Sequence, residues 1–298
     1  MIWCSGWELA SAVSNAGGLG IIGAGSMYPE ILRQHIRNCK TATSKPFGVN
    51  VPLLYPDIEQ HMKVIMEEGV NIVFTSAGNP KTWTSVLKKS DIKVVHVVSS
   101  SKFAVKAEDA GCDAVVAEGF EAGGHNGREE TTTMVLIPLV KQVISVPLIA
   151  AGGIASGRSM MAAFALGAEG VQLGTRFAAS TEASAHENFK QKIISLEEGS
   201  TMVAMKKIVP VRLVKNKFYE QIQDAEDRGA KADEIRTILG RARAKRGMFE
   251  GDLEEGELEI GEVSAGIRTI KPAAEIVREV WEEFLAVKQE LTMMNTDI

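Results

Sequence analysis

The residues best suited to chemistry lie in one short segment, around His125. Residues 118–127 read Glu-Gly-Phe-Glu-Ala-Gly-Gly-His-Asn-Gly and follow an apolar run at 113–117 that has the character of a buried strand. Histidine can give or take a proton near neutral pH, and glycines such as Gly123 and Gly124 let the backbone approach a flat ligand closely. The segment predicts a proton-transfer site just past the carboxyl end of a strand. The alternative is a histidine that only orders a surface loop.

Two later segments also place glycines at strand ends. The first, at 146–157, contains Ala151, Gly152 and Gly153, and the second, at 167–177, contains Gly174 and Thr175. Backbone N–H groups at such turns, and at a helix N-terminus, form an anion site without a lysine. In a parallel barrel the last two strand-end loops commonly hold a phosphate together. We therefore predict a phosphate site, the alternative being glycines that serve tight turns only.

Composition limits the classes of protein that fit. The chain has 298 residues, 45% of them hydrophobic, and a formal net charge of −5, which gives no general attraction to nucleic acid or to an anionic membrane. It contains no run of eighteen apolar residues and no basic segment followed by an apolar one, so a soluble cytoplasmic protein is expected. Three scattered cysteines indicate reduced thiols rather than a disulfide framework or a zinc site, and no metal is expected.

Strand-like and helical stretches alternate along the first 177 residues. The strands are apolar throughout rather than at every second position, which indicates a parallel sheet covered on both faces. The expected strands are 18–23, 47–53, 71–76, 93–98, 114–117, 147–150 and 170–173. This predicts an α/β fold of the TIM-type (β/α)8 barrel, with the first strand expected upstream of Met1. An open doubly wound sheet is the alternative, but functional residues at so many strand ends favour the barrel.

The remainder of the chain has a different character. We expect a barrel over 1–179, a helical, charged lid or substrate subdomain without strands over 180–258, and a segment at 259–298 that packs back on the barrel. That last segment contains an amphipathic helix from Ala273 to about Glu290, and the tail from 292 to 298 is expected to fray.

Several motifs together resemble one flavin-dependent family. It contains the nitronate monooxygenases, formerly 2-nitropropane dioxygenases, and the flavin-type (type II) enoyl-acyl-carrier-protein reductases. The resemblance runs over nearly the whole chain, and it implies an FMN-binding TIM barrel with a helical insertion near the C-terminal end. The motifs are residues 1–3, 15–23, 46–50, 76–80, 118–127, 150–154 and 174–177.

The resemblance also assigns roles to individual residues. Asn50 is expected to face the flavin ring, or else only to close a turn before Pro52. Glu118 either touches the ribityl chain or fixes the His125 loop. The expected cofactor-binding residues are Met1, Asn50, Glu118, Gly123, Gly124, Ala151, Gly152, Gly153, Gly174 and Thr175. The last four of these are expected to clamp the phosphate.

Within the family, the reductase motifs fit better. Residues 47–50, 76–80, 117–125 and 263–266 all resemble the reductase. The resemblance then implies that FMN carries hydride from NADPH or NADH to the β-carbon of a trans-2-enoyl thioester in fatty acid synthesis. The catalytic residue His125 would protonate the α-carbon or stabilise the enolate. The alternatives are a nitronate monooxygenase that uses O2, and a flavin-binding protein without turnover.

A partner is suggested by two basic segments, 206–217 and 241–246. Acyl carrier protein is an acidic helical partner, and a local cationic surface would steer its encounter with an acidic enzyme. The alternative is two ordinary solvated helix faces. A homodimer is usual for relatives of this kind and is expected here.

Overall fold

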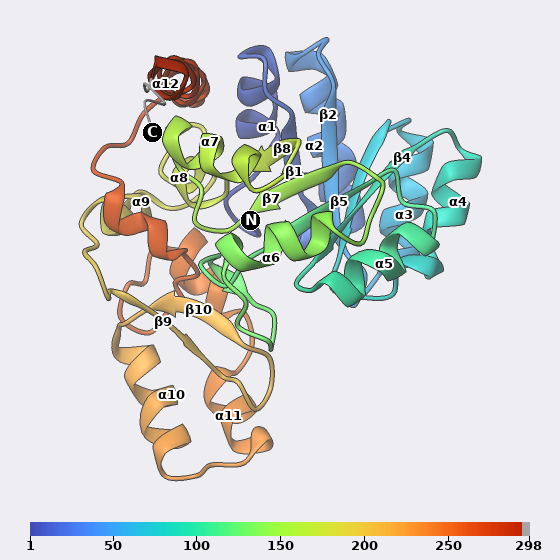
Figure 1. The fold of residues 1–298 in the computed structure, drawn as a ribbon. Helices are drawn as coiled ribbons and strands as arrows, with labels where there is room; N and C mark the ends of the chain where they lie inside the picture. Colours follow the sequence, from blue (N-terminus) through green and yellow to red (C-terminus); the bar gives the residue numbers. More distant parts are fainter. Residues whose placement is uncertain (294–298) are drawn as a thin grey trace.

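Seven short strands form one parallel sheet that carries the site. The computed structural model describes residues 1–293, and its sheet has the order β1-β2-β3-β4-β5-β7-β8 with every neighbouring pair parallel (Figure 1). The strands are β1 (Gly20–Gly23), β2 (Phe47–Pro52), β3 (Ile72–Ser76), β4 (Lys93–Val98), β5 (Ala114–Glu118), β7 (Leu148–Ala151) and β8 (Gly170–Gln172). All seven strands expected from the sequence are confirmed, and the curled parallel sheet confirms the TIM-type α/β class.

The sheet is buried on both faces. Val49, Val73 and Val115 point outward into the main core beneath the helices, whereas Phe74 and Val116 point inward to a separate inner core. This double burial explains why the strands read as continuous apolar runs. The covering helices are α1 (Trp7–Asn15), α2 (Pro29–Ala42), α3 (Ile58–Glu67), α4 (Thr84–Lys89), α5 (Ser101–Asp109), α6 (Thr133–Lys141) and α7 (Gly157–Ala165).

The two edge strands, β1 and β8, are bridged at their carboxyl ends by the first residue of the chain. A Cβ placed on Gly23, the last residue of β1, would lie 2.7 Å from the carbonyl oxygen of Met1. A Cβ placed on Gly174, just beyond β8, would lie 3.7 Å from Cγ of Met1. Met1 therefore sits between the ends of the edge strands.

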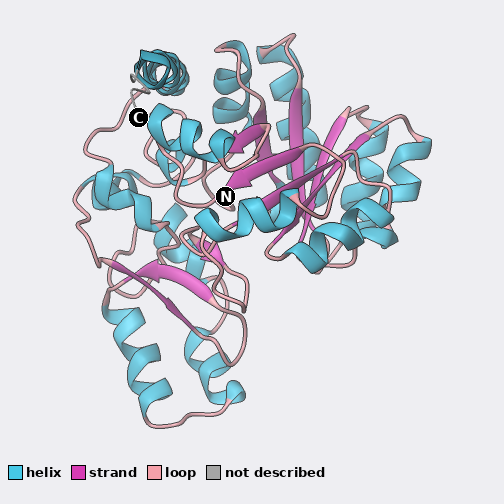
Figure 2. Ribbon diagram, in the orientation of Figure 1, coloured by secondary structure: helices cyan, strands magenta, loops and turns pink. Residues whose placement is uncertain are grey.

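A second, antiparallel sheet lies below the barrel in Figures 1 and 2, with the order β6-β10-β9. Its strands are β6 (Gly124–His125), β9 (Thr201–Ala204) and β10 (Val211–Val214), and α9 (Glu187–Ile194), α10 (Lys217–Asp227) and α11 (Ala232–Leu239) accompany it. The expectation that 180–258 holds no strand is therefore wrong. β9 and β10 have only four residues each, Lys206 and Lys207 lie in the turn between them, and Arg212 lies within β10, so no clear strand pattern appears in the sequence.

The C-terminal segment packs back on the barrel as predicted. A short helix at Glu262–Gly266 precedes α12 (Ala273–Met293), which lies against α7 and α1. The helix runs through Thr292 and Met293, where fraying was expected, and the rest of that tail, 294–298, lies outside the described residues. The three cysteines are free and buried. In residues 1–293 no helix is both long enough and apolar enough to cross a bilayer.

Candidate functional site

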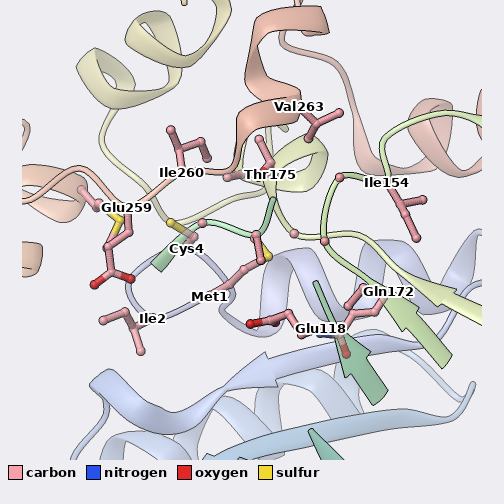
Figure 3. Close-up of a pocket in the computed structure, with 18 residues that line it drawn as sticks. Met1, Ile2, Cys4, Glu118, Ile154, Gln172, Thr175, Glu259, Ile260 and Val263 are labelled. Carbon is pink, nitrogen blue, oxygen red and sulfur yellow. The ribbon is translucent and has the colours of Figure 1, made fainter. Parts of the chain in front are cut away.

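The carboxyl ends of β5, β7 and β8 open into one cavity of about 130 Å³ (Figure 3). The predicted cofactor residues that line it share positions at strand ends or in the loops directly beyond. They are Met1, Glu118, Gly123, Ala151, Gly152, Gly153, Gly174 and Thr175. The fold therefore brings together eight of the ten residues assigned from the resemblance.

The glycines at one end of this cavity form a cradle of unpaired N–H groups. Gly152 and Gly153 have φ of +92° and +70°, and a Cβ on Gly152 would lie 2.8 Å from the carbonyl oxygen of Gly119. Within residues 1–293, the N–H groups of Gly152, Gly153 and Gly174 donate no hydrogen bond. Thr175 Oγ1 accepts the N–H of Gly261 at 3.1 Å, which leaves the hydroxyl proton to donate outward. Such a set of donors fits the phosphate of FMN.

Glu118 and Gln172 supply side chains at the floor of the cavity. Glu118 ends β5 and Gln172 ends β8, both on the inner face of the sheet, and Figure 3 shows them close to the side chain of Met1. Burial raises the pKa of Glu118 to about 7. Near neutral pH this carboxyl group can therefore both donate and accept hydrogen bonds to the uncharged part of a ligand.

Two predicted cofactor residues lie outside the lining of this cavity. Asn50 is on the inner face of β2, where its Nδ2 donates to the carbonyl oxygen of Phe74 at 3.4 Å. Gly124 has φ of +78° and is covered by Glu259, whose Oε2 would lie 2.7 Å from a Cβ at this position. Their flavin contacts stay predictions, and Gly124 has a structural reason to be glycine in any case.

A second cavity of about 330 Å³ adjoins the first and contains His125. The two cavities share Ile2 and Glu259 in their walls. The second is largely apolar, with a minority of polar and charged side chains in its wall. Its apolar lining includes Trp3, Met205, Ile208, Val209, Val211 and Leu239, and its polar residues include Tyr55, His125, Glu257 and Glu259. A cavity of this size and character is typical of a site for a small, mainly apolar ligand.

The two acidic residues in this wall are held in an apolar setting. Burial, followed by the charge of Glu259, raises the pKa of Glu257 to about 8. Burial also raises the pKa of Glu259, although the nearby charge of His125 opposes that shift. In the sequence both residues lie in an acidic stretch, 250–262, which gave no sign of their burial. Gln172, by contrast, lies in an expected strand and could have been found from its inward position.

The segment that carries His125 is fixed from both sides. His125 pairs with Val211 and Gly124 pairs with Arg212 in the small sheet. Arg212 is buried, its guanidinium stacks 4.7 Å from the ring centroid of Phe120, and its Nη2 donates to the carbonyl oxygen of Phe120 at 3.0 Å. The histidine is thus held on a strand with an exposed side chain, rather than on an irregular loop as expected.

The basic segments expected to form a cationic surface are partly neutralised. Arg212 is buried and pairs with Glu262 at 2.8 Å, so it belongs to the interior and not to a surface patch. The remaining ion pairs share one property, an acidic partner on an adjacent loop or helix. They are Lys206–Glu130, Lys217–Glu255, Arg243–Glu255, Lys245–Glu250 and Arg246–Asp252.

Comparisons with known proteins agree with this geometry. The family model of nitronate monooxygenase matches residues 1–63 and 56–283. A probable nitronate monooxygenase of Staphylococcus saprophyticus is 34% identical over 74% of this chain and 75% of its own length. A hydroxy-methyl-oxo-octahydro-indene-carboxyl-CoA dehydrogenase of Rhodococcus jostii is 34% identical over 69% of this chain, which spans only 58% of that relative.

Two solved structures resemble the whole described chain. FabK from Thermotoga maritima has a TM-score of 0.93 and 43% identity, covering 98% of this chain and 93% of that one. A nitroalkane oxidase from Streptomyces ansochromogenes has a TM-score of 0.84 and 25% identity, covering 97% and 95%. The matched family model, the barrel and the glycine cradle agree: the chain belongs to the nitronate monooxygenase family and is a flavin-dependent oxidoreductase.

Proposed function

We propose that this protein is an FMN-dependent reductase that uses NADPH or NADH to reduce trans-2-enoyl thioesters carried by acyl carrier protein. The single observation that carries the proposal is the apolar cavity of about 330 Å³ that opens at His125 beside the glycine cradle. An acyl chain suits such a lining, whereas a small nitronate needs far less room. The likeness to FabK, at 43% identity against 25% for the nitroalkane oxidase, supports the same choice.

The residues of the chain divide the work as follows. The N–H groups of Gly152, Gly153 and Gly174, together with the Thr175 hydroxyl, would hold the FMN phosphate. Bound there, the flavin would supply hydride transfer from the nicotinamide to the β-carbon of the substrate. His125, exposed at the neighbouring cavity, would give a proton to the α-carbon.

Nitronate oxidation is the second candidate. The matched family model and the relative from Staphylococcus saprophyticus both carry that name, and the same His125 would then serve the nitronate while O2 acts as oxidant. In this alternative the larger cavity would have no long acyl chain to receive. Anaerobic assays separate the two activities because only the monooxygenase depends on O2.

The test is reduction of the bound flavin under anaerobic conditions, first with NADPH and then with NADH. Reoxidation by a crotonyl thioester supports the reductase, and its absence together with O2 consumption on a nitronate assigns the second candidate. Bound flavin that neither nicotinamide reduces, and that no nitronate reduces, would indicate a flavin-binding protein without turnover. The homodimer and the cytoplasmic location stay predictions, and size-exclusion chromatography with light scattering tests the first.

A further inference from the structure

Glu259 shares one strand edge with His125. Along this edge of β10, Val211 pairs with His125 and Leu213 pairs with Glu259. Directly opposed residues lie on the same face of a sheet, as do residues two apart along a strand. His125 and Glu259 therefore project from one face, roughly 7 Å apart along the edge at two residues of strand rise. Both line the same cavity.

Gly124, the residue between them along this edge, leaves room for the Glu259 carboxyl group. Gly124 pairs with Arg212, has φ of +78° and carries no side chain. A Cβ here would lie 2.7 Å from Glu259 Oε2, so the carboxyl group lies directly over this glycine. Burial raises the pKa of Glu259, and the charge of His125 opposes that shift.

We propose that Glu259 is a positioning residue that orients the imidazole of His125. For the reaction concerned, the inference rests on the proposed function. In each turnover an N–H bond of the imidazolium breaks and a C–H bond forms at the α-carbon, using the electron pair of the enolate left by hydride addition. The neutral imidazole then takes up a proton from solvent, because His125 is exposed.

Other titratable groups line the two cavities around the pair. Glu257 lies two residues away in the same cavity wall, where burial and then the charge of Glu259 raise its pKa. Lys245, Arg243 and Tyr55 also line this cavity, and Glu118 lines the first cavity. Among these groups, Glu259 alone lines both cavities.

A titration of Glu259 tests the pair without measuring turnover. Carboxyl 13C NMR of glutamate-labelled protein follows the group, and its resonance is assigned by its loss in Glu259→Gln. In His125→Asn, we expect the Glu259 midpoint to move to higher pH, because the positive charge that lowers its pKa is gone. An unchanged midpoint would overturn the proposal.

The activity test compares Glu259→Gln with Glu254→Gln. Glu254 is exposed five residues earlier, so its variant matches the loss of charge but lies outside both cavities. We expect Glu259→Gln to lower kcat about tenfold on a crotonyl thioester, less than the roughly 10²–10⁴-fold expected for losing His125 itself. Its pH–rate profile should also lose one limb, while Glu254→Gln retains the wild-type rate and profile. Equal profiles for both variants would contradict the proposal.

Gly124→Ala provides a second route that keeps both titratable groups. The added methyl group would displace the carboxyl group, so the same loss of a pH limb is expected. If wild-type protein ignores enoyl thioesters while the Glu259 midpoint still responds to His125→Asn, the proposed function fails and the pair stands. If wild-type protein reduces enoyl thioesters but the Glu259 midpoint does not respond to His125→Asn, the proposed function stands and only the pair is refuted. The two failures are therefore distinguishable.

Discussion

Replacing Gly153 with aspartate should weaken FMN binding strongly, through charge rather than through size. Gly153 has φ of +70°, and a Cβ would lie 3.3 Å from Cβ of Glu121, so a short side chain fits with a small shift of that neighbour. A carboxylate about 4–5 Å from one phosphate charge costs roughly 3–4 kcal/mol at an effective dielectric constant of about 20. This corresponds to a rise in Kd of roughly 10²–10³-fold.

Gly153→Asn is the matched control for that experiment. Asparagine has the size of aspartate and tolerates positive φ better than most residues, so the two variants differ mainly in charge. The Kd of each apoprotein for FMN is measured by quenching of flavin fluorescence, and the melting temperature of each apoprotein shows whether the nearby Glu121 carboxylate destabilises the aspartate variant. If the two variants bind FMN equally well, the phosphate does not lie at this glycine.

Three further predictions concern the remaining parts of the site. His125→Ala should retain FMN yet slow enoyl reduction roughly 10²–10⁴-fold, as followed by NAD(P)H oxidation, and a wild-type rate would leave His125 as a residue that only orders its strand. The raised pKa of Glu118 means that the folded apoprotein binds a proton at this carboxyl group more tightly than the unfolded chain does. The free energy of unfolding should therefore fall by up to about 3 kcal/mol as pH rises from 4.5 to about 7. Glu118→Gln should flatten this part of the pH profile in urea unfolding, and an equally steep profile would refute the assignment. Lys215 and Arg241 are exposed and make no ion pair within residues 1–293. Reversing both to glutamate should raise KM for a substrate on acyl carrier protein and leave KM for a short thioester unaffected. An equal effect on both substrates would mean that Lys215 and Arg241 lie on an ordinary solvated face.

The barrel could be predicted because its signal is local. The large sheet is buried on both faces, so a short run of mostly apolar residues marks each strand directly. The two glycines of the cradle were equally visible, since Gly152 and Gly153 both adopt positive φ and Gly152 closely approaches the backbone of Gly119. In both cases the constraint acts on residues adjacent in the sequence.

The small sheet could not be predicted for the opposite reason. β6 is only Gly124 and His125, a pair with no strand propensity, and it is a strand because Val211 and Arg212 arrive opposite it from 86 residues further along the chain. Arg212 looked like a surface charge because its burial depends on the distant Phe120 and Glu262. Long-range pairing of this kind leaves no pattern within a short window.

The same long-range pairing determines what the site can do. The barrel provides the glycine cradle and Glu118, the insertion provides most of the apolar cavity, and the C-terminal segment begins with Glu259. His125 belongs to both, because its segment leaves β5 of the barrel and then pairs with β10 of the small sheet. A change in the insertion that moves β10 would therefore move the proposed proton donor relative to the flavin site while leaving the phosphate cradle intact. Relatives with one barrel could thus differ in reaction through the insertion alone, consistent with function residing in the site rather than in the fold.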